Sequence, residues 1–530
     1  MQQDYISFRD TGYFSKLMCD YLDMKPEVAS FYNRYPNIEN FKSQIEEKKE
    51  AFTTASRQTL AKALQNQYKH IKASSLTLNN IELLRNANTF TVTTGHQLNL
   101  FTGPLYFLHK IIATINLAKA LKNEYPDCNF VPIYWMATED HDFEEINYFN
   151  FKGKKVQWHR EDGGAVGTFN TVGLEAVFNA FASQLGQTQN AKELKRLFKS
   201  AYLEHDNLAH ATRYLANELF KNYGLVILDA DDKDLKQQFM PYVKEELLAN
   251  TAYKTVTETN KALSKNYSIQ VNPREINLFY LSKGVRERII YNNDLYSVNN
   301  TNITWTKEQL LEHVALKPEC FSPNVIMRPL YQEVILPNLC YIGGGGEIAY
   351  WFQLKAYFKS VKVPFPMLLL RNSVLIQTKK QKDKLNNLNI SLKTIFLKRH
   401  VFINKKIREI SNINIDFTEQ KKQLEAQFQE LYTIAQQTDK SFLGAVKAQE
   451  KKQIDGLNYL EKRLLKAQKL KLADQVSRMT TLQNELFPGQ SLQERNTNFS
   501  ELYLEYGATL IPSLVEALNP LKNEFLVLTI

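Results

Sequence analysis

Residues Thr89 to Lys110 read TFTVTTGHQLNLFTGPLYFLHK, and residues Phe130 to Ile146 read FVPIYWMATEDHDFEEI. Thr89–Thr94 and Phe130–Met136 are short apolar segments typical of strands, and apolar residues recur at helical spacing from Pro104 to about Leu121. A strand, a helix and a second strand in this order predict a βαβ unit. We therefore expect an α/β protein with a Rossmann-like parallel sheet.

Polar loops follow both strands of this unit, at Gly95–Gly103 and at Glu139–Glu145. The carboxyl ends of parallel strands meet at one edge of the sheet, where ligands bind, so both loops are expected to face one crevice. Gly103 would let the backbone approach a ligand, and Pro104 suits the first turn of the helix. Free N–H groups at that helix start would attract a phosphate.

The segment after the second strand is dense in charged side chains. Six ionisable residues stand within seven positions: Glu139, Asp140, His141, Asp142, Glu144 and Glu145. Such density is unfavourable unless a cation or an amine-bearing substrate binds there. The alternative is a helix start whose acids interact favourably with the helix dipole. A His-Glu-x-x-His zinc signature is absent, so Mg²⁺ arriving with a nucleotide is expected rather than a dedicated metal site.

Three residues of the first loop and helix are candidates for contact with substrates. His109 lies on the first turns of the expected helix and could donate to a phosphoryl oxygen as charge develops on it. A single helical histidine is, however, often packed or solvated. His96 and Gln97 follow the strand directly and are expected to position a substrate.

Further apolar runs extend the predicted sheet. Leu225–Leu228, Leu339–Ile342 and Met367–Leu370 are short and continuously apolar, as strands buried on both faces are. The run Gly343–Gly346, followed by Glu347, comes after one of them and opens a helix. These glycines could present a group of N–H donors to a nucleotide, or they could form a flexible turn.

Composition sets broad bounds on function. The chain has 530 residues, a formal net charge of +10 and four widely spaced cysteines without a metal-ligand or disulfide pattern. No secretory signal and no apolar run of the ~20 residues that a membrane helix needs is visible, so a cytoplasmic protein is expected. The basic stretch from Lys379 to Arg408 is interpreted as a solvated helical face, because no nucleic-acid-binding motif accompanies it.

The chain is expected to divide into four segments. They are an N-terminal helical segment at 1–88, a nucleotide-binding core at 89–373 with insertions at about 151–223 and 265–306, a helical coiled-coil domain at 374–487, and a segment at 488–530 that packs on the core. Between Phe417 and Met479 apolar residues recur at three- and four-residue steps, with a lapse near Gln436–Lys440. This stripe predicts a homodimer, and an intramolecular hairpin is the competing outcome.

One block of the sequence resembles a nucleotide-binding site. FTGPLYFLHK, Phe101–Lys110, resembles the opening of the nucleotidylyl transferase site of class I aminoacyl-tRNA synthetases, in which a Gly-Pro-Leu-like turn leads into His-Ile-Gly-His under ATP. Tyr106 stands in place of the first histidine, Leu108 in place of the glycine, and His109 keeps its type. The Lys-Met-Ser-Lys-Ser loop of those enzymes is not found. Candidates for the cations that grip the triphosphate are Arg371, Lys379 and Lys380.

A second resemblance extends over most of the chain. The sequence is similar to the cysteine ligases of bacillithiol biosynthesis, the BshC family, in blocks that follow one another in the same order. These blocks are Thr94–Gln97, Leu100–Tyr106, Glu139–Ile146, Leu228–Asp232, Arg328–Glu333, Gly343–Tyr350, Leu492–Arg495 and Tyr506–Gly507.

The resemblance implies ATP-dependent formation of an amide between the carboxylate of cysteine and the amine of glucosaminyl malate, which gives bacillithiol. ATP or ADP, with Mg²⁺, is the expected nucleotide. The implied residues are His109, Asp140 and Asp142 for catalysis; Gly103, Pro104, Tyr106, His109, Gly343, Gly344 and Glu347 for the nucleotide; and His96, Gln97, Glu139, His141, Asp229, Arg328, Tyr331 and Gln332 for substrates. The alternative is a coiled-coil adaptor that keeps a nucleotide-binding core and catalyses nothing alone.

Overall fold

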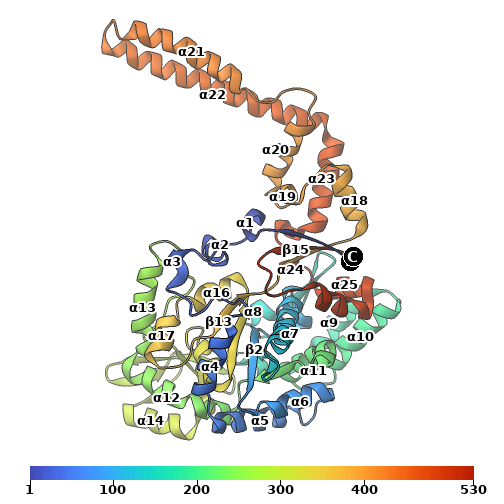
Figure 1. Ribbon diagram of the computed structural model, residues 1–530, viewed down its shortest axis with the longest axis vertical. Helices are drawn as coiled ribbons and strands as arrows, with labels where there is room; N and C mark the ends of the chain where they lie inside the picture. Colours follow the sequence, from blue (N-terminus) through green and yellow to red (C-terminus); the bar gives the residue numbers. More distant parts are fainter. Residues whose placement is uncertain (162) are drawn as a thin grey trace. The chain divides into compact units, whose positions relative to one another are not determined.

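The computed structural model describes residues 1–161 and 163–530 (Figure 1). The chain divides into two compact units. The first comprises Met1–Arg9, Tyr13–Leu375 and Gln493–Leu528, and the second comprises Asp10–Gly12, Ile376–Leu492 and Thr529–Ile530. The last helices of the chain therefore belong to the same unit as its first strands.

A five-stranded parallel sheet forms the centre of the first unit, which confirms the predicted Rossmann-like sheet. Its strands, in spatial order, are β13 (Met367–Leu370), β12 (Asn338–Gly343), β2 (Thr89–His96), β3 (Asn129–Met136) and β6 (Val226–Asp229). The order along the chain reverses between β2 and β12. Their carboxyl ends therefore flank the topological switch point, where open α/β sheets bind ligands.

The core forms around strands that are buried on both faces. Every residue of β2 is buried, and Phe90 and Val92 pack in one cluster with Ala113 and Leu117 of α7 (Tyr106–Glu124). Figure 1 shows α7 beside β2. This helix begins two residues later than expected from Pro104. Its C-cap residue, Tyr125, precedes a proline, which disfavours helical geometry at the residue before it.

The segment before β2 is mostly helical, but it begins with a strand that the sequence pattern did not reveal. β1 (Gln2–Ile6) pairs with β15 (Phe525–Thr529), which in turn pairs with β14 (Val374–Gln377). The helices that follow are α1 (Phe8–Thr11), α2 (Lys16–Leu22), α3 (Pro26–Ala29), α4 (Phe41–Ala51), α5 (Thr54–Tyr68) and α6 (Ser75–Leu83).

Two insertions interrupt the winding of the sheet. The first contains α8 (Phe143–Ile146), the hairpin β4 (Tyr148–Phe151) and β5 (Lys154–Gln157), and the helices α9 (Leu174–Leu185), α10 (Gln189–Tyr202) and α11 (Leu208–Phe220). The second follows α12 (Lys233–Ala249) and α13 (Thr251–Leu263). It is an antiparallel sheet of β7 (Leu278–Ser282), β8 (Val285–Asn292), β9 (Leu295–Val298), β10 (Thr304–Trp305) and β11 (Phe321–Pro323), with α14 (Lys307–Leu316) between the last two strands.

The chain then returns to the parallel sheet and completes the first unit. The remaining helices of this unit are α15 (Arg328–Ile335), α16 (Gly345–Trp351), α17 (Lys355–Ser360), α24 (Gln493–Asn496), α25 (Phe499–Tyr506) and α26 (Leu510–Ala517). In sequence, α15 precedes β12 and α16 follows it.

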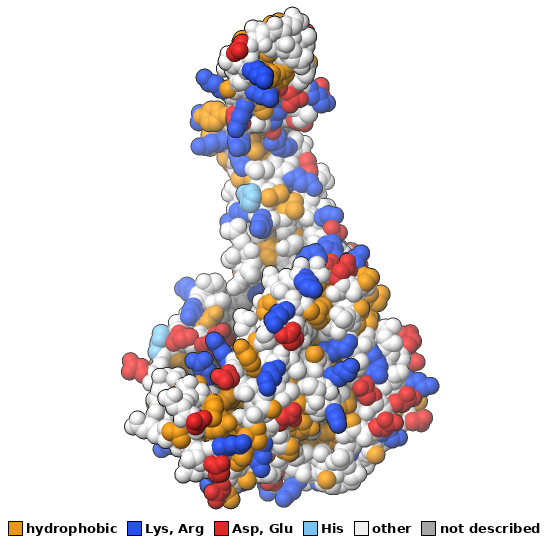
Figure 2. Space-filling model, turned by 90° about the vertical axis from the view of Figure 1, so that its left-hand side faces the viewer, with side chains coloured by type: hydrophobic (Ala, Val, Ile, Leu, Met, Phe, Trp, Pro, Cys, Tyr) orange, Lys and Arg blue, Asp and Glu red, His pale blue; other side chains and the backbone are white. Residues whose placement is uncertain are grey.

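The second unit is helical and contains the expected coiled coil. It is built from α18 (Lys379–Asn387), α19 (Leu392–Ile395), α20 (Arg399–Ile410), α21 (Thr418–Ala435), α22 (Lys440–Lys471) and α23 (Ala473–Leu486). Figure 2 shows lysine and arginine side chains interspersed with apolar ones over its helices.

α21 and α22 lie side by side as a hairpin within one chain (Figure 1). Phe428, Ala435 and Val446 form a buried cluster between them, and the Tyr432 hydroxyl donates to Glu450 over 2.5 Å. The turn at 436–439 coincides with the lapse in the apolar pattern. The hairpin, which was the competing outcome, thus accounts for part of the stripe, and self-association stays a prediction.

In the described part of the chain, we find no helix with both the length and the apolar character needed to span a bilayer.

Candidate functional site

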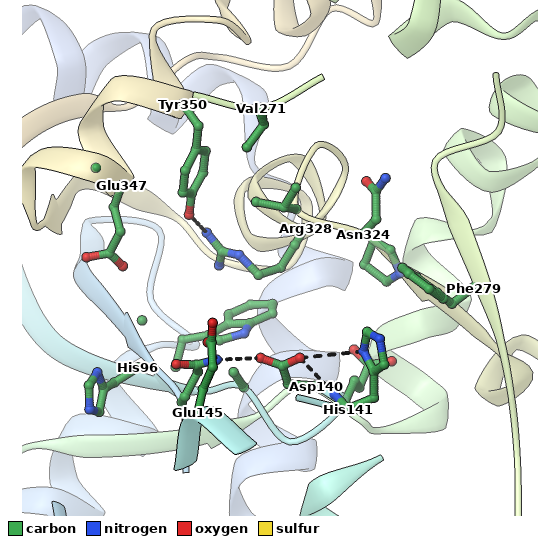
Figure 3. A pocket seen from close by; sticks show the side chains of 18 of the residues that line it. His96, Asp140, His141, Glu145, Val271, Phe279, Asn324, Arg328, Glu347 and Tyr350 are labelled. Carbon is green, nitrogen blue, oxygen red and sulfur yellow. Dashed lines mark hydrogen bonds and ion pairs between the residues drawn. The ribbon is translucent and has the colours of Figure 1, made fainter. Parts of the chain in front are cut away.

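A cleft of about 1160 Å³ opens at the carboxyl edge of the parallel sheet. Its walls come from the ends of β2, β3 and β12, from α7, α15 and α16, and from the inserted antiparallel sheet. In the view of Figure 3, Glu347 and His96 lie toward one end and Phe279 and Asn324 toward the other, with Arg328 between them. The cleft thus lies at the switch point predicted by the strand order.

Lys110 and Glu347 form a partly buried ion pair across the switch point. Lys110 Nζ lies 2.6 Å from Glu347 Oε2 and donates to the Gly95 carbonyl over 2.7 Å. The Tyr341 hydroxyl and the Gly344 N–H also donate to the Glu347 carboxylate, at 2.9 and 2.7 Å. Burial alone would raise the pKa of Glu347, but the Lys110 charge and these hydrogen bonds lower it. Glu347 is therefore an ionised wall of the cleft.

Packing explains the first glycine of the run, Gly343, whereas a Cβ on Gly344 or Gly346 would meet its neighbours only at ordinary contact distance. In the described chain, none of the four glycines at 343–346 has a positive φ, and the Gly344 N–H already donates to Glu347. A Cβ on Gly343 would lie 2.9 Å from the Tyr341 ring. The Gly344 N–H is thus not free for a nucleotide, although Gly344 and Glu347 do line the cleft.

His109 lies behind the cleft wall and not in the cleft. Its side chain is fully buried, and its Nδ1 is 3.3 Å from Glu494 Oε2. Burial lowers the pKa of His109, an effect that Glu494 offsets only in part, so the ring is neutral at pH 7. The expectation that His109 touches a phosphoryl group is corrected accordingly. Tyr106 and Lys110, four residues apart, share the helix face toward the cleft, and His109 points about 100° away from Lys110.

Arg371 joins this buried group to the cleft. It follows β13 and lines the cleft, and its Nη2 donates to Glu494 Oε1 over 2.8 Å. Its guanidinium carbon lies 5.1 Å from the centre of the Tyr106 ring. The Arg371 charge and the His109 contact outweigh the effect of burial and hold the pKa of Glu494 well below its usual range.

The acidic loop after β3 is held by hydrogen bonds. The Gln97 amide donates to Asp140 Oδ2 over 2.9 Å and to Glu145 Oε2 over 2.8 Å. Asp140 Oδ1 accepts the backbone N–H of His141 over 2.7 Å, and His141 Nδ1 lies 2.5 Å from Arg286. Gln97, Asp140, His141 and Glu145 all line the cleft. Asp142 is exposed at the start of α8 and does not belong to the lining.

Glu139 contacts a different cation from its neighbours. Its Oε1 lies 2.7 Å from Lys236 Nζ, which also pairs with Asp231 at 2.6 Å. Burial raises the pKa of Glu139, against the lowering influence of Lys236. Asp229 accepts a 2.5 Å hydrogen bond from the Thr138 hydroxyl and stands beside the cleft without lining it. Of these acids, only Glu139 meets the cleft.

Arg328 is a cation of the cleft without a carboxylate partner. It lies between the rings of Trp135 and Tyr341, 5.6 Å from the centre of each, and donates to the Tyr350 hydroxyl over 3.4 Å (Figure 3). Burial would lower the pKa of Arg328, but the electron-rich hydroxyls around it raise the pKa. No carboxylate oxygen lies within 4 Å of its guanidinium in the described chain. This cation is available to an anionic ligand.

Other residues expected at the site have structural places. Tyr331 and Gln332 are buried on α15, where Tyr331 donates to the Ala230 carbonyl over 2.7 Å and Gln332 to Glu333 over 3.0 Å. Gly103 has φ +60° and ψ −133°, a backbone region open essentially to glycine alone, and its carbonyl accepts from Asn498. Pro104 pairs with the same Asn498. Conformation, rather than ligand approach, explains this turn.

His96 does line the cleft. Its ring is packed between Tyr106 and Phe107, at centroid distances of 5.5 and 5.0 Å. Burial lowers the pKa of His96 well below the usual range, so the ring is neutral. No partner for its Nε2 is found in the described chain.

The inserted sheet supplies cations that were missed from the sequence. Arg286 and Arg288 lie two residues apart on β8, and both line the cleft, together with Arg274 and with Glu287, which stands between them. Arg286 lies 4.1 Å from the Phe279 ring centre, and burial lowers its pKa. An i, i+2 pair in a strand points to one face. That pattern could have been read from the sequence, but the sequence did not show that this face closes the cleft.

Within residues 1–161 and 163–530, no group of three or more His, Cys, Asp or Glu side chains is arranged to hold a metal ion.

This structure belongs to the class of Rossmann-like α/β proteins with two insertions, a ligand cleft at the switch point and an appended coiled-coil unit. Residues 1–372 match the N-terminal Rossmann-like domain of bacillithiol biosynthesis BshC, and residues 374–530 match its C-terminal coiled-coil domain. The chain therefore belongs to the BshC family, which confirms the resemblance drawn from the sequence.

Full-length relatives support this assignment. A protein of Flavobacterium johnsoniae is 59% identical over 530 residues, covering 100% of both chains, and one of Christiangramia forsetii is 57% identical, covering 100% of this chain and 99% of its own. A protein of Cytophaga hutchinsonii is 36% identical and covers 97% and 96%. Each bears the name "Putative cysteine ligase BshC". The relatives are thus named as ligases.

Proposed function

We propose that this chain is an ATP-dependent ligase that joins the carboxylate of cysteine to the amine of glucosaminyl malate. The observation that carries the proposal is the cleft at the switch point, whose walls combine unpaired arginines with a hydrogen-bonded acidic loop. Anionic substrates suit the arginines, and an ammonium group suits the acids. The relatives are named as cysteine ligases, and glucosaminyl malate is the acceptor that the resemblance in the sequence implies.

The nucleotide is assigned to the end of the cleft near the switch point. A cleft of about 1160 Å³ exceeds the ~300–1,000 Å³ of ordinary small-molecule pockets, so it has room for ATP beside a second substrate. Arg371, Arg328 and Arg495 line it and would face phosphate oxygens. Lys379 and Lys380 belong to the helical unit and receive no role here. Mg²⁺ would arrive with the nucleotide.

The other substrates are assigned to the acidic loop and the inserted sheet. Asp140 and Glu145, fixed by Gln97, would hold the amino group of cysteine. Arg274, Arg286 and Arg288 line the cleft and have no carboxylate within 4 Å in the described chain, so they suit the two carboxylates of the malate group. The amine of the acceptor would then lie between these two regions.

The reaction requires an activated carboxylate. In one route, a cysteine carboxylate oxygen attacks the α-phosphorus and releases pyrophosphate, and the acceptor amine then displaces AMP from the acyl carbon. In the other route, the γ-phosphorus is attacked and ADP is released before the amine displaces phosphate. The fixed guanidinium groups would stabilise the charge that develops on the phosphoryl oxygens in either route.

A homodimer through the helical hairpin is part of the proposal. Ile434 and Leu460 remain 54% exposed and Leu470 remains 72% exposed on α21 and α22, after the hairpin has formed. A second copy would cover these side chains.

The proposed ligase activity is tested by measuring the products formed from the nucleotide. Enzyme, ATP, Mg²⁺ and cysteine, with and without glucosaminyl malate, should give AMP or ADP only when cysteine is present. Labelled pyrophosphate should exchange into ATP in the adenylate route and not in the γ-phosphoryl route. Nucleotide binding without any cysteine-dependent product would contradict the proposal and favour the adaptor.

A further inference from the structure

Glu494 lies in the middle of a buried group that ends at the cleft. It follows the whole helical unit in sequence, in α24, yet it contacts residues of α7 and of the segment after β13. Its side chain is 1% exposed, and those of Arg371 and His109 are 4% and 0% exposed. A carboxylate so deeply buried is held there only by its partners.

Both oxygens of this carboxylate are engaged. Oε1 accepts from Arg371 Nη2 over 2.8 Å, and Oε2 accepts the Val374 N–H over 2.9 Å and lies 3.3 Å from His109 Nδ1. His109 and the Val374 N–H therefore fix the carboxylate, and the carboxylate fixes the guanidinium. All three partners of the Glu494 carboxylate, namely Arg371, the Val374 N–H and His109, are groups of the protein itself.

Arg371 has five N–H donors, of which three are used, and its Nε–H is one of those left over. Its Nη1 donates to the Asn372 carbonyl over 2.8 Å and to the Ser373 hydroxyl over 3.1 Å, and its Nη2 donates to Glu494. Its Nε is buried and has no partner in the described chain. A Cβ built on Gly344 would lie 3.8 Å from this Nε, which places the donor against the glycine run at the cleft. The planar guanidinium is thus anchored on one edge with a donor free at the cleft.

We propose that Glu494 is a positioning residue that holds Arg371 in place to bind the phosphates of the nucleotide. This inference rests on the proposed function in assigning a nucleotide to the cleft. The neighbouring Arg495 lines the cleft directly. The short helix α24 therefore delivers both a positioning carboxylate and a cleft cation after the chain has completed its helical unit.

The proposal predicts an effect on phosphate recognition in particular. Glu494→Gln removes the charge that orients Arg371 while nearly preserving side-chain shape. Calorimetric titration should show ATP bound about 10-fold more weakly, because the guanidinium that donates to the phosphates is no longer held in place, whereas adenosine should bind as in the wild type. Glu494→Asp should recover part of the ATP affinity, and Arg371→Lys, which keeps the charge but lacks the fork, should not.

A control separates positioning from general loss of stability. Arg57 is a buried cation that donates to the Leu84, Ala87 and Thr89 carbonyls, and these residues do not line the cleft. Arg57→Met should lower the unfolding temperature without changing the ratio of ATP to adenosine affinity. If Glu494→Gln failed to fold, the Asp and Arg371→Lys variants would carry the same comparison.

The outcomes of this binding experiment can be distinguished from those of the assay for ligase products. An unchanged ATP to adenosine ratio in folded Glu494→Gln overturns the positioning role, even if the wild type makes product. A reduced ratio supports it, even if no product forms under any substrate mixture. A wild type that binds ATP no better than adenosine overturns it as well.

Discussion

Two buried, neutral histidines lie near the cleft: His96 lines it, and His109 is packed behind its wall. Because burial lowers the pKa of His96 and of His109, the unfolded chain binds protons at these positions before the folded chain does. Protonation of these two histidines therefore favours the unfolded chain over the folded one. Their contribution is fully favourable above the ordinary histidine pKa of ~6.5 and is lost as the pH falls below it.

Because protonation of these histidines favours the unfolded chain, the folded protein should become less stable as the pH falls. The unfolding temperature should fall as the pH is lowered from 7 to 5, and His109→Gln, whose amide can still donate to Glu494, should flatten that dependence. His70→Gln is the matched control, because His70 is exposed. Differential scanning calorimetry at several pH values measures both. A wild-type slope retained in His109→Gln would show that His109 does not titrate on unfolding.

At the scale of elements, the buried strands were predictable because of their chemistry. The apolar run predicted at Met367–Leu370 has the same bounds as strand β13. A strand that is covered on both faces forms one continuous apolar run, which is visible in the sequence. β1 was missed because Gln2–Ile6 is polar and gains its strand form only by pairing with β15. Local pattern carries no information about such a distant partner.

The site was less predictable than the sheet for a similar reason. The helical period alone would have favoured Lys110 over His109, since Lys110 shares a face with Tyr106. No local signal gives the docking of the inserted sheet or the return of Glu494, because both depend on contacts between residues far apart in sequence.

The inserted sheet predicts a specific kinetic effect. Arg288→Gln should raise the KM for glucosaminyl malate ~10-fold, equivalent to ~1.4 kcal/mol, because it removes a charged contact to the acceptor's carboxylates. The KM for ATP should stay unchanged. Steady-state kinetics with each substrate varied in turn provides the comparison. Lys283→Gln, an exposed change on the same hairpin outside the cleft lining, is the control.

An equal effect of Arg288→Gln on both KM values would contradict this division of the cleft. It would mean that the inserted sheet acts on the shape of the site as a whole and not on one substrate.

At the scale of the whole molecule, the helical unit presents apolar side chains that a partner would cover. Its hairpin buries Phe428, Ala435 and Val446 internally and leaves other apolar side chains of the same helices in contact with solvent. Exposed apolar stripes on long helices are unfavourable in water unless a partner covers them. A dimer is therefore expected at micromolar concentrations.

Light scattering on the full chain tests the dimer. The wild type should show twice the mass of the 61.5 kDa chain, and the double variant Leu460→Glu with Leu470→Glu should be monomeric because two charges would be buried in the interface. Lys462→Glu, an exposed change on the same helix, should leave the dimer intact. A wild-type mass of one chain at every concentration would rule the dimer out.

The central claim is that this chain joins cysteine to an amine at the switch-point cleft. Mass spectrometry of a mixture of enzyme, ATP, Mg²⁺, cysteine and glucosaminyl malate tests it most directly, with Arg328→Gln run beside the wild type. We expect the wild type to form bacillithiol. The folded variant should form at least about 10-fold less, because it lacks a charged hydrogen bond to the anionic substrate. No bacillithiol from folded wild type that binds ATP, or equal amounts from both proteins, would contradict it.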